Sequence, residues 1–172
     1  MPSRRTLTTS LTLALLLAAG ALAGGGPQIG DTVPDFDLPR VGGGRVSFFN
    51  QMKTKKAALV VFWSIDCPAC RAQLPRMAKL YPEFSEKGLE IVAVNKGDPE
   101  PDLKKFKEQH GIQYSLAMGG GEGNYAVGHA YGVKAYPTNL LITPEGKVLW
   151  RVVGFSEIGL RRQLKKAGLD IE

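Results

Sequence analysis

Apolar residues are grouped along the chain in two kinds of pattern. Runs rich in apolar and β-branched residues occupy 57–63 and 89–95, and they predict buried strands. Between these runs an apolar set recurs at helical spacing: Leu74, Met77, Ala78 and Tyr81. Pro82 and Gly88 are expected to bracket the end of that helix, so the pattern predicts a strand–helix–strand unit.

Shorter patterns extend this unit on both sides. An N-terminal hairpin turns at 42–44, and strands are expected at 114–118, 140–142 and 148–152. A last helix is expected after Ser156, with an apolar side formed by Ile158, Leu160, Leu164 and Leu169. Alternating strands and helices followed by a hairpin and a helix predict an α/β fold with a central mixed sheet flanked by helices.

The first 23 residues have the three parts of a secretory signal peptide. Arg4 and Arg5 precede an almost wholly apolar stretch at 11–19, and 21–23 reads Ala-Leu-Ala, which predicts cleavage after Ala23. This apolar stretch is shorter than the about 20 residues of a spanning helix. An uncleaved N-terminal membrane anchor remains the alternative, and either outcome places the protein outside the cytoplasm.

The rest of the chain has the length of one domain. We expect a linker at 24–30 and a single domain at 31–172. Loss of Arg4 and Arg5 with the signal lowers the formal net charge from +6 to +4. The remaining lysines and arginines are scattered and form no basic stripe, so no nucleic-acid partner is expected. We expect a monomer.

The chain has two cysteines, Cys67 and Cys70, directly after the first buried run. A disulfide over so short a loop would stabilise the fold little as a passive staple. A structural zinc site needs four ligands, and the only histidines, His110 and His129, lack ligand-like spacing. The pattern therefore favours redox chemistry over a passive disulfide or a metal site.

The chemistry follows from the position of the pair at the start of a helix. Backbone N–H groups and the helix dipole there favour a thiolate, which makes Cys67 the expected nucleophile. Cys70, one turn further on, is expected to be the more buried thiol that resolves the mixed disulfide. Pro68 suits the first helical position because its missing N–H would be unpaired there.

These residues resemble the active site of a known superfamily. Phe62-Trp63, Cys67-Pro68 and Cys70-Arg71 are similar to thioredoxins, and the segment 131–147 is similar to the TlpA/ResA-like extracytoplasmic branch. The resemblance covers roughly 30–170. It implies a thioredoxin-like fold with an N-terminal β-hairpin extension and an inserted βα unit at 89–110.

The resemblance also implies roles for residues around the dithiol. Pro137 would be a cis-proline facing the disulfide, and Trp63, Pro68, Ala69 and Tyr136 would frame the substrate. No metal and no cofactor are implied. The function implied is that of a thiol–disulfide oxidoreductase acting on exported proteins, with cytochrome c maturation as one family role. Electrons would come from a membrane thiol–disulfide transporter or a thioredoxin-like reductase.

Two departures from the family pattern bear on the mechanism. Val61 stands where thioredoxins place a buried acid, and Asp98 falls where we expect the acid of ResA-like proteins; alternatively, Asp98 caps a helix. Asp66 precedes the nucleophile, where its charge would raise the pKa of Cys67 unless Arg71 offsets it. We expect a reducing dithiol, with a potential nearer about −270 mV than about −120 mV.

Two other functions remain open at this point. Ser64 and Cys67 fit part of a peroxiredoxin pattern, although Val60 stands where that pattern has proline. A non-catalytic copper carrier could use Cys67, Cys70 and His129.

Overall fold

The computed structural model describes residues 25–120 and 125–171. The predicted signal peptide lies outside these residues. In chain order the elements are β1 (Asp37–Pro39), β2 (Arg45–Ser47), α1 (Phe48–Met52), β3 (Ala57–Trp63), α2 (Pro68–Glu86), β4 (Leu89–Asn95), α3 (Glu100–Gln109), β5 (Ser115–Met118), α4 (Ala126–Ala130), β6 (Thr138–Ile142), β7 (Val148–Val153) and α5 (Glu157–Lys166). Within this part of the chain no helix is both long and apolar enough to cross a membrane.

The central sheet has five strands in the order β5-β4-β3-β6-β7. β3 pairs parallel with β4, and β4 pairs parallel with β5. β6 pairs antiparallel with β3, and β7 pairs antiparallel with β6. The sheet is therefore mixed, as the sequence predicts, and β3 lies at its centre.

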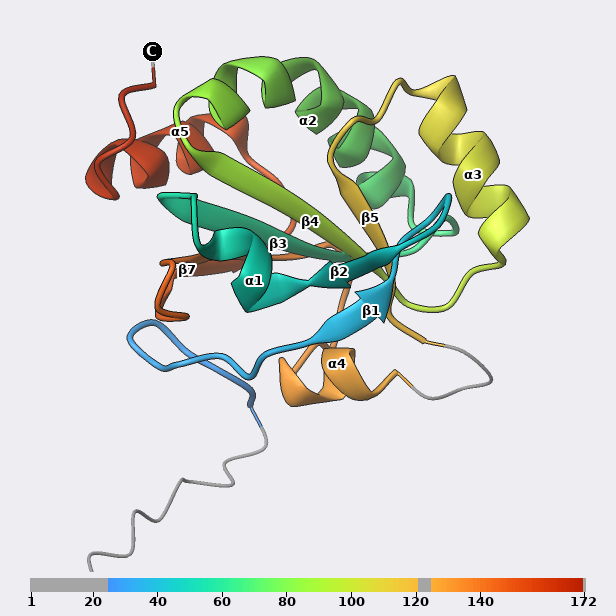
Figure 1. The fold of residues 1–172 in the computed structure, drawn as a ribbon, viewed down its shortest axis with the longest axis horizontal. Helices are drawn as coiled ribbons and strands as arrows, with labels where there is room; N and C mark the ends of the chain where they lie inside the picture. Colours follow the sequence, from blue (N-terminus) through green and yellow to red (C-terminus); the bar gives the residue numbers. More distant parts are fainter. Residues whose placement is uncertain (1–24, 121–124, 172) are drawn as a thin grey trace, which may run out of the picture.

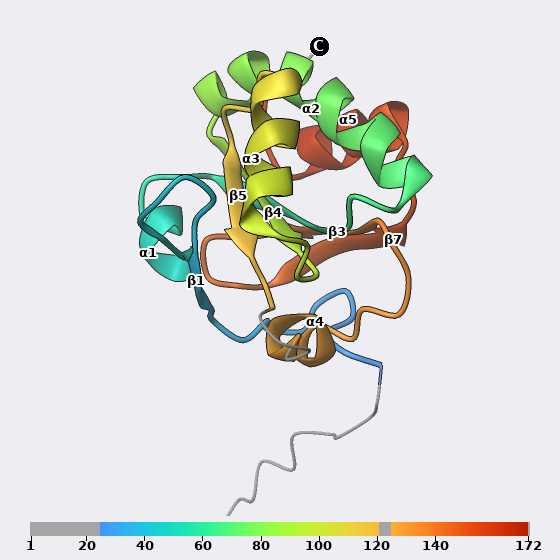
Figure 2. The same ribbon diagram turned by 90° about the vertical axis from the view of Figure 1, so that its right-hand side faces the viewer.

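Helices cover both faces of the sheet, which explains why β3 and β4 are apolar without alternation. Figures 1 and 2 show α2, α3 and α5 on one face, and α1, α4 and the β1–β2 hairpin on the other. Leu59, Val61 and Trp63 belong to the core under α2, α3 and α5. The alternate residues Val60 and Phe62 belong to the core on the opposite face.

Helix α2 runs through Pro75 and Pro82 and ends at Glu86. This end lies between Pro82 and Gly88, as the sequence predicts. A proline inside a helix removes one backbone hydrogen bond and strains the preceding turn. Here Leu80 and Phe84 are buried against the sheet on either side of Pro82, and this packing holds the helix together.

The last helix confirms its predicted cap but not its whole predicted face. The Ser156 hydroxyl accepts a hydrogen bond from the backbone N–H of Gly159 at 3.1 Å. Leu160 and Leu164 are buried, whereas Ile158 is 74% exposed. Residues two apart lie on nearly opposite sides of a helix, so Ile158 cannot share the face of Leu160.

The N-terminal segment is attached to the domain earlier than the expected boundary at residue 31. The backbone N–H of Gly30 donates to the carbonyl of Val148 on β7 at 2.8 Å. The Arg151 guanidinium donates to the carbonyl of Pro27 at 3.3 Å and to that of Tyr131 at 2.9 Å. The described part of the expected linker is thus hydrogen-bonded to the domain.

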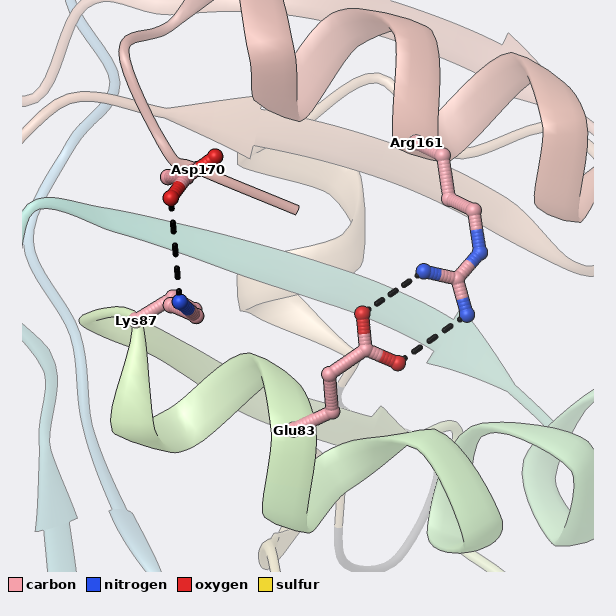
Figure 3. A pocket seen from close by; sticks show the side chains of 4 residues that line it. All are labelled: Glu83, Lys87, Arg161 and Asp170. Atoms are coloured by element: carbon pink, nitrogen blue, oxygen red, sulfur yellow. Dashed lines mark hydrogen bonds and ion pairs between the residues drawn. The ribbon is translucent and has the colours of Figure 1, made fainter. Parts of the chain in front are cut away.

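Ion pairs join the C-terminal half of α2 to α5 and the tail behind it. Arg161 binds both carboxylate oxygens of Glu83, at 2.7 and 3.1 Å, and Lys87 lies 3.8 Å from the carboxylate of Asp170 (Figure 3). The hydrogen bonds from Arg161 hold the pKa of Glu83 below its usual value. These side chains line a shallow pocket, but they neutralise one another and lie at the end of α2 remote from the cysteines. We therefore treat this cluster as structural.

Candidate active site

The two cysteines lie in the connection from the central strand to α2. Cys67 and Cys70 form a disulfide, with their Cα atoms 5.2 Å apart. Cys67 is the N-cap residue of α2, and its Sγ accepts a hydrogen bond from the backbone N–H of Cys70 at 3.1 Å. Pro68 occupies the first helical position, where no N–H is needed. A thiolate on Cys67 would thus be stabilised by the start of α2.

The two sulfur-bearing residues differ in exposure. Cys67 is partly exposed, while Cys70 is fully buried in the core under α2. Pro68 and Ala69, between them, are exposed and form the outer surface of the turn. An incoming disulfide can reach Cys67 from solvent but cannot reach Cys70 directly, which is the arrangement that a nucleophile and a resolving thiol require.

The segment before β6 carries the cis bond that the resemblance implies. The Tyr136–Pro137 peptide bond is cis. Thr138 pairs with Phe62 in the antiparallel register of β3 and β6, so Pro137 lies at the end of the sheet from which the dithiol turn departs. Pro137 is buried, and Tyr136 beside it is partly exposed.

Trp63 does not frame a substrate surface as expected. Its side chain is fully buried, and its ring lies 5.1 Å from that of Phe106 on α3. As the last residue of an apolar strand covered on both faces, it belongs to the core and supports the dithiol turn from beneath. In this disulfide-bonded form it offers no surface to a partner.

Asp98 is bound to the dithiol turn rather than to a helix. Its Oδ2 accepts hydrogen bonds from the backbone N–H of Ile65 at 2.7 Å and from the side-chain amide of Asn95 at 2.8 Å. The N-cap of α3 is Pro99, and no side chain caps that helix. The alternative that Asp98 caps a helix is therefore wrong. Asp98 fixes the backbone two residues before Cys67.

The cation beside Asp66 is Lys96, not the expected Arg71. The Lys96 Nζ lies 3.7 Å from an Asp66 carboxylate oxygen. The Asp66 side chain is 84% exposed, so water and the lysine both screen its charge. This arrangement weakens the like-charge effect on Cys67 that the sequence suggests.

A buried polar chain beneath the cysteines escaped the sequence reasoning. The Gln73 amide donates to Asn139 Oδ1 at 2.6 Å, and the Asn139 amide donates to the carbonyl of Gly154 at 2.8 Å. The N–H of Gly154 donates to the carbonyl of Pro137 at 2.8 Å. The chain links α2, one turn after Cys70, to the cis-proline segment. Two features of the sequence could have indicated this chain: the amide of Gln73 lies on the otherwise apolar face of α2, and the amide of Asn139 lies inside the apolar run of β6.

Metal binding by the cysteines requires further ligands close by. In residues 25–120 and 125–171, no three side chains of His, Cys, Asp or Glu are grouped so that they could hold a metal ion. His129 lies on α4, which covers the face of the sheet opposite to α2 (Figure 2). The copper-carrier alternative, with Cys67, Cys70 and His129 as ligands, is therefore not supported.

The sequence and the fold are both similar to those of known proteins. The model of the AhpC/TSA family matches residues 29–151, which is more than half of the chain. The chain belongs to the AhpC/TSA family. Its thioredoxin-like fold and its TlpA/ResA-like character agree with the relatives that it matches.

Two curated relatives and one solved structure illustrate this likeness. The chain is 32% identical over 155 residues to the thiol-disulfide oxidoreductase ResA of Bacillus subtilis, covering 86% of this chain and 84% of the relative. It is 33% identical over 126 residues to ResA of Geobacillus thermodenitrificans, covering 73% and 70%. A Chlorobium tepidum protein assigned as thiol:disulfide interchange protein DsbE is 31% identical, with a TM-score of 0.69, covering 82% of this chain and 98% of that one.

These relatives and the Cys67–Cys70 disulfide agree on the chemistry. This member of the AhpC/TSA family is an enzyme, a protein thiol–disulfide oxidoreductase. Its substrates are, in general, disulfides of proteins.

Proposed function

We propose that this enzyme reduces disulfides in exported proteins, with Cys67 as nucleophile and Cys70 as resolving thiol. The observation that carries the proposal is the difference between the two cysteines, because Cys67 is partly exposed at the start of α2 and Cys70 is fully buried behind it. Two pairs of residues lie beside this turn. Pro68 and Ala69 lie between the cysteines, and Tyr136 and Pro137 directly precede β6, which pairs with β3. We assign these four residues to the surface that receives the substrate.

The proposed reaction has two exchanges. The Cys67 thiolate attacks one sulfur of the substrate disulfide, forming a mixed disulfide and releasing the other substrate sulfur as a thiolate. The Cys70 thiol then loses its proton and attacks Cys67, which releases the second substrate thiolate and forms the Cys67–Cys70 disulfide. Two electrons pass from the enzyme to the substrate, and both substrate thiolates take up protons.

The direction proposed here depends on how stable the reduced dithiol is. No histidine lies between the cysteines to stabilise a Cys67 thiolate, and the exposed Asp66 next to it is negative. Equilibration with glutathione buffers is expected to give a reduction potential nearer about −270 mV than about −120 mV. A measured reduction potential above about −150 mV would show instead that the enzyme is an oxidant, because strongly oxidising dithiols have potentials near about −120 mV.

A reductant outside the cytoplasm needs a supply of electrons. The N-terminal sequence has the pattern of a signal peptide or of an uncleaved anchor, and we propose that the domain works beyond the cytoplasmic membrane. We assign the supply to a membrane thiol–disulfide transporter or a thioredoxin-like reductase. Apocytochromes c, whose haem-binding cysteines must be reduced, are one class of substrate that would need such an enzyme.

A peroxidase function has less support at this site. Ser64, which would correspond to the hydroxyl of a peroxiredoxin pattern, is 2% exposed and accepts a hydrogen bond from the backbone N–H of Asp66 at 3.2 Å. The peroxiredoxin pattern requires proline at position 60, and this chain has Val60 there, buried within β3. Slow peroxide consumption and no sulfenic acid on Cys67 are the expected results.

Asp98 is the proposed proton acceptor for Cys70. Replacing Asp98 by Asn removes a negative charge near the dithiol and keeps a side-chain oxygen for the N–H of Ile65. We expect the pKa of a thiol in the reduced protein to fall, because a nearby carboxylate opposes ionisation. Release of the mixed disulfide should slow by about a hundredfold or more, the usual contribution of a general base. Thiolate absorbance against pH and single-turnover kinetics measure both effects. Unchanged thiol pKa values in the variant would remove Asp98 from the mechanism.

A further inference from the structure

A groove lies beside the dithiol turn, between the start of α2 and α3. Ile65 and Arg71 line it from the dithiol side, and Asp102, Lys105, Phe106 and His110 line it from α3. Its volume of about 320 Å³ is within the range of small ligand sites. Ile65 is two residues before Cys67, and Arg71 directly follows Cys70. A polypeptide joined to Cys67 through a disulfide could therefore extend along this groove.

The groove has an apolar floor that is held rigidly. Phe106 is 7% exposed, and its ring lies 5.1 Å from that of Trp63 in the core and 4.5 Å from that of His110. Ile65 is partly exposed, and its backbone N–H is fixed by Asp98. The floor can thus contact the apolar part of a side chain without rearranging.

The charges at the rim are not balanced. Arg71 and Lys105 are exposed, and neither takes part in an ion pair within the described part of the chain. The neighbouring lysines differ, since Lys96 pairs with Asp66 and Lys104 pairs with Glu100. Asp102 is the acid on the wall, and it lies in the first turn of α3, where a helix N-terminus stabilises a carboxylate. Among the described residues, the groove is thus lined by two cations that have no ion-pair partner and by one acid at a helix N-terminus.

We propose that this groove selects protein disulfides that have an acidic residue, Asp or Glu, close to the cysteine that Cys67 attacks. The methylene groups of such a residue would contact Phe106 and Ile65, and its carboxylate would pair with Lys105 or Arg71. This inference rests on the proposed function, because it names the substrate class of the same dithiol.

The test uses the full mature chain and two peptides that share one intramolecular disulfide and differ at one flanking position, Glu in one and Lys in the other. The readout is the ratio of the two kcat/KM values. The wild-type enzyme is expected to prefer the Glu peptide by about two- to fivefold, which is within the range measured for exposed charge pairs. Lys105→Glu is expected to invert the preference, and Lys105→Gln to remove most of it. High salt is expected to reduce the ratio.

Lys165→Glu serves as the matched control, because it makes the same change of charge on an exposed position of α5. It is expected to leave the ratio as in the wild type. Equal kcat/KM values for the two peptides in the wild type, or an equal change in both variants, would overturn the proposal. If the wild-type enzyme reduced neither peptide and also failed to reduce a small uncharged disulfide, the proposed function itself would be contradicted instead.

Discussion

Replacing Cys70 by Ser is expected to stall the enzyme on its substrate, while replacing Cys67 by Ser is expected to lower exchange to the uncatalysed rate. Cys67 is partly exposed, and Cys70 is fully buried. Without Cys67 no mixed disulfide forms, because the remaining thiol cannot meet an incoming disulfide. Without Cys70 the first exchange still occurs, but no thiol lies in place to resolve it.

Non-reducing electrophoresis and mass spectrometry measure this difference. Cys70→Ser is expected to accumulate covalent adducts through Cys67, and treatment with dithiothreitol should release the partner. The Cys67→Ser/Cys70→Ser double variant controls for non-specific capture. Adducts of equal amount in Cys67→Ser and Cys70→Ser would show that the assignment of the two roles is wrong. The trapped proteins would also identify the substrates.

The second large effect is expected on stability. Replacing Trp63 by Ala should lower the free energy of unfolding by about 3–5 kcal/mol, the range measured for large aromatic residues truncated in a core. Trp63 is fully buried and packs against Phe106. The loss of its ring leaves a cavity between the sheet and α3, directly beneath the dithiol turn.

Trp63→Phe is the matched control for this prediction. Among the described residues, the indole N–H of Trp63 is one of the buried polar groups without a hydrogen-bond partner. Phenylalanine therefore keeps much of the ring and loses no hydrogen bond, and its effect should be clearly smaller than that of alanine. Urea unfolding of the oxidised proteins, followed by circular dichroism, compares the variants. An alanine variant as stable as the wild type would contradict the burial of this side chain.

The sequence predicts the parts of the fold that depend on local pattern. The bounds of β3 and β4 agree with the apolar runs at 57–63 and 89–95, because strands covered on both faces are apolar throughout. Placing Cys67 at the start of a helix required only the run before it and the spacing after it. The end of α2 at Glu86 also lies between Pro82 and Gly88, as predicted. The helix continues past Pro82 because packing of Leu80 and Phe84 outweighs the local effect of the proline.

The finer structure of the site depends on contacts between distant residues. Asp98 meets Ile65, 33 positions away, and Gln73 meets Asn139, 66 positions away. No periodicity reports such pairs, so the sequence left a helix cap open as an alternative for Asp98 and indicated no role for Gln73. Lys96 replaces Arg71 as the partner of Asp66 for the same reason, since the fold brings the end of β4 beside the dithiol turn.

The hydrogen bonds of Asn139 have a consequence for how a partner protein is received. Asn139 is held by Gln73 on one side and by the carbonyl of Gly154 on the other. The side chains of Asn139 and Gln73 are both buried, so water cannot replace the hydrogen bond between them. Tilting α2 away from β6 would leave amide groups unpaired, at about 1–3 kcal/mol each. On the proposed substrate surface, the start of α2 and the cis-proline segment are thereby held in place before a partner protein binds. Recognition is therefore expected to depend on the shape of the partner rather than on rearrangement of the enzyme.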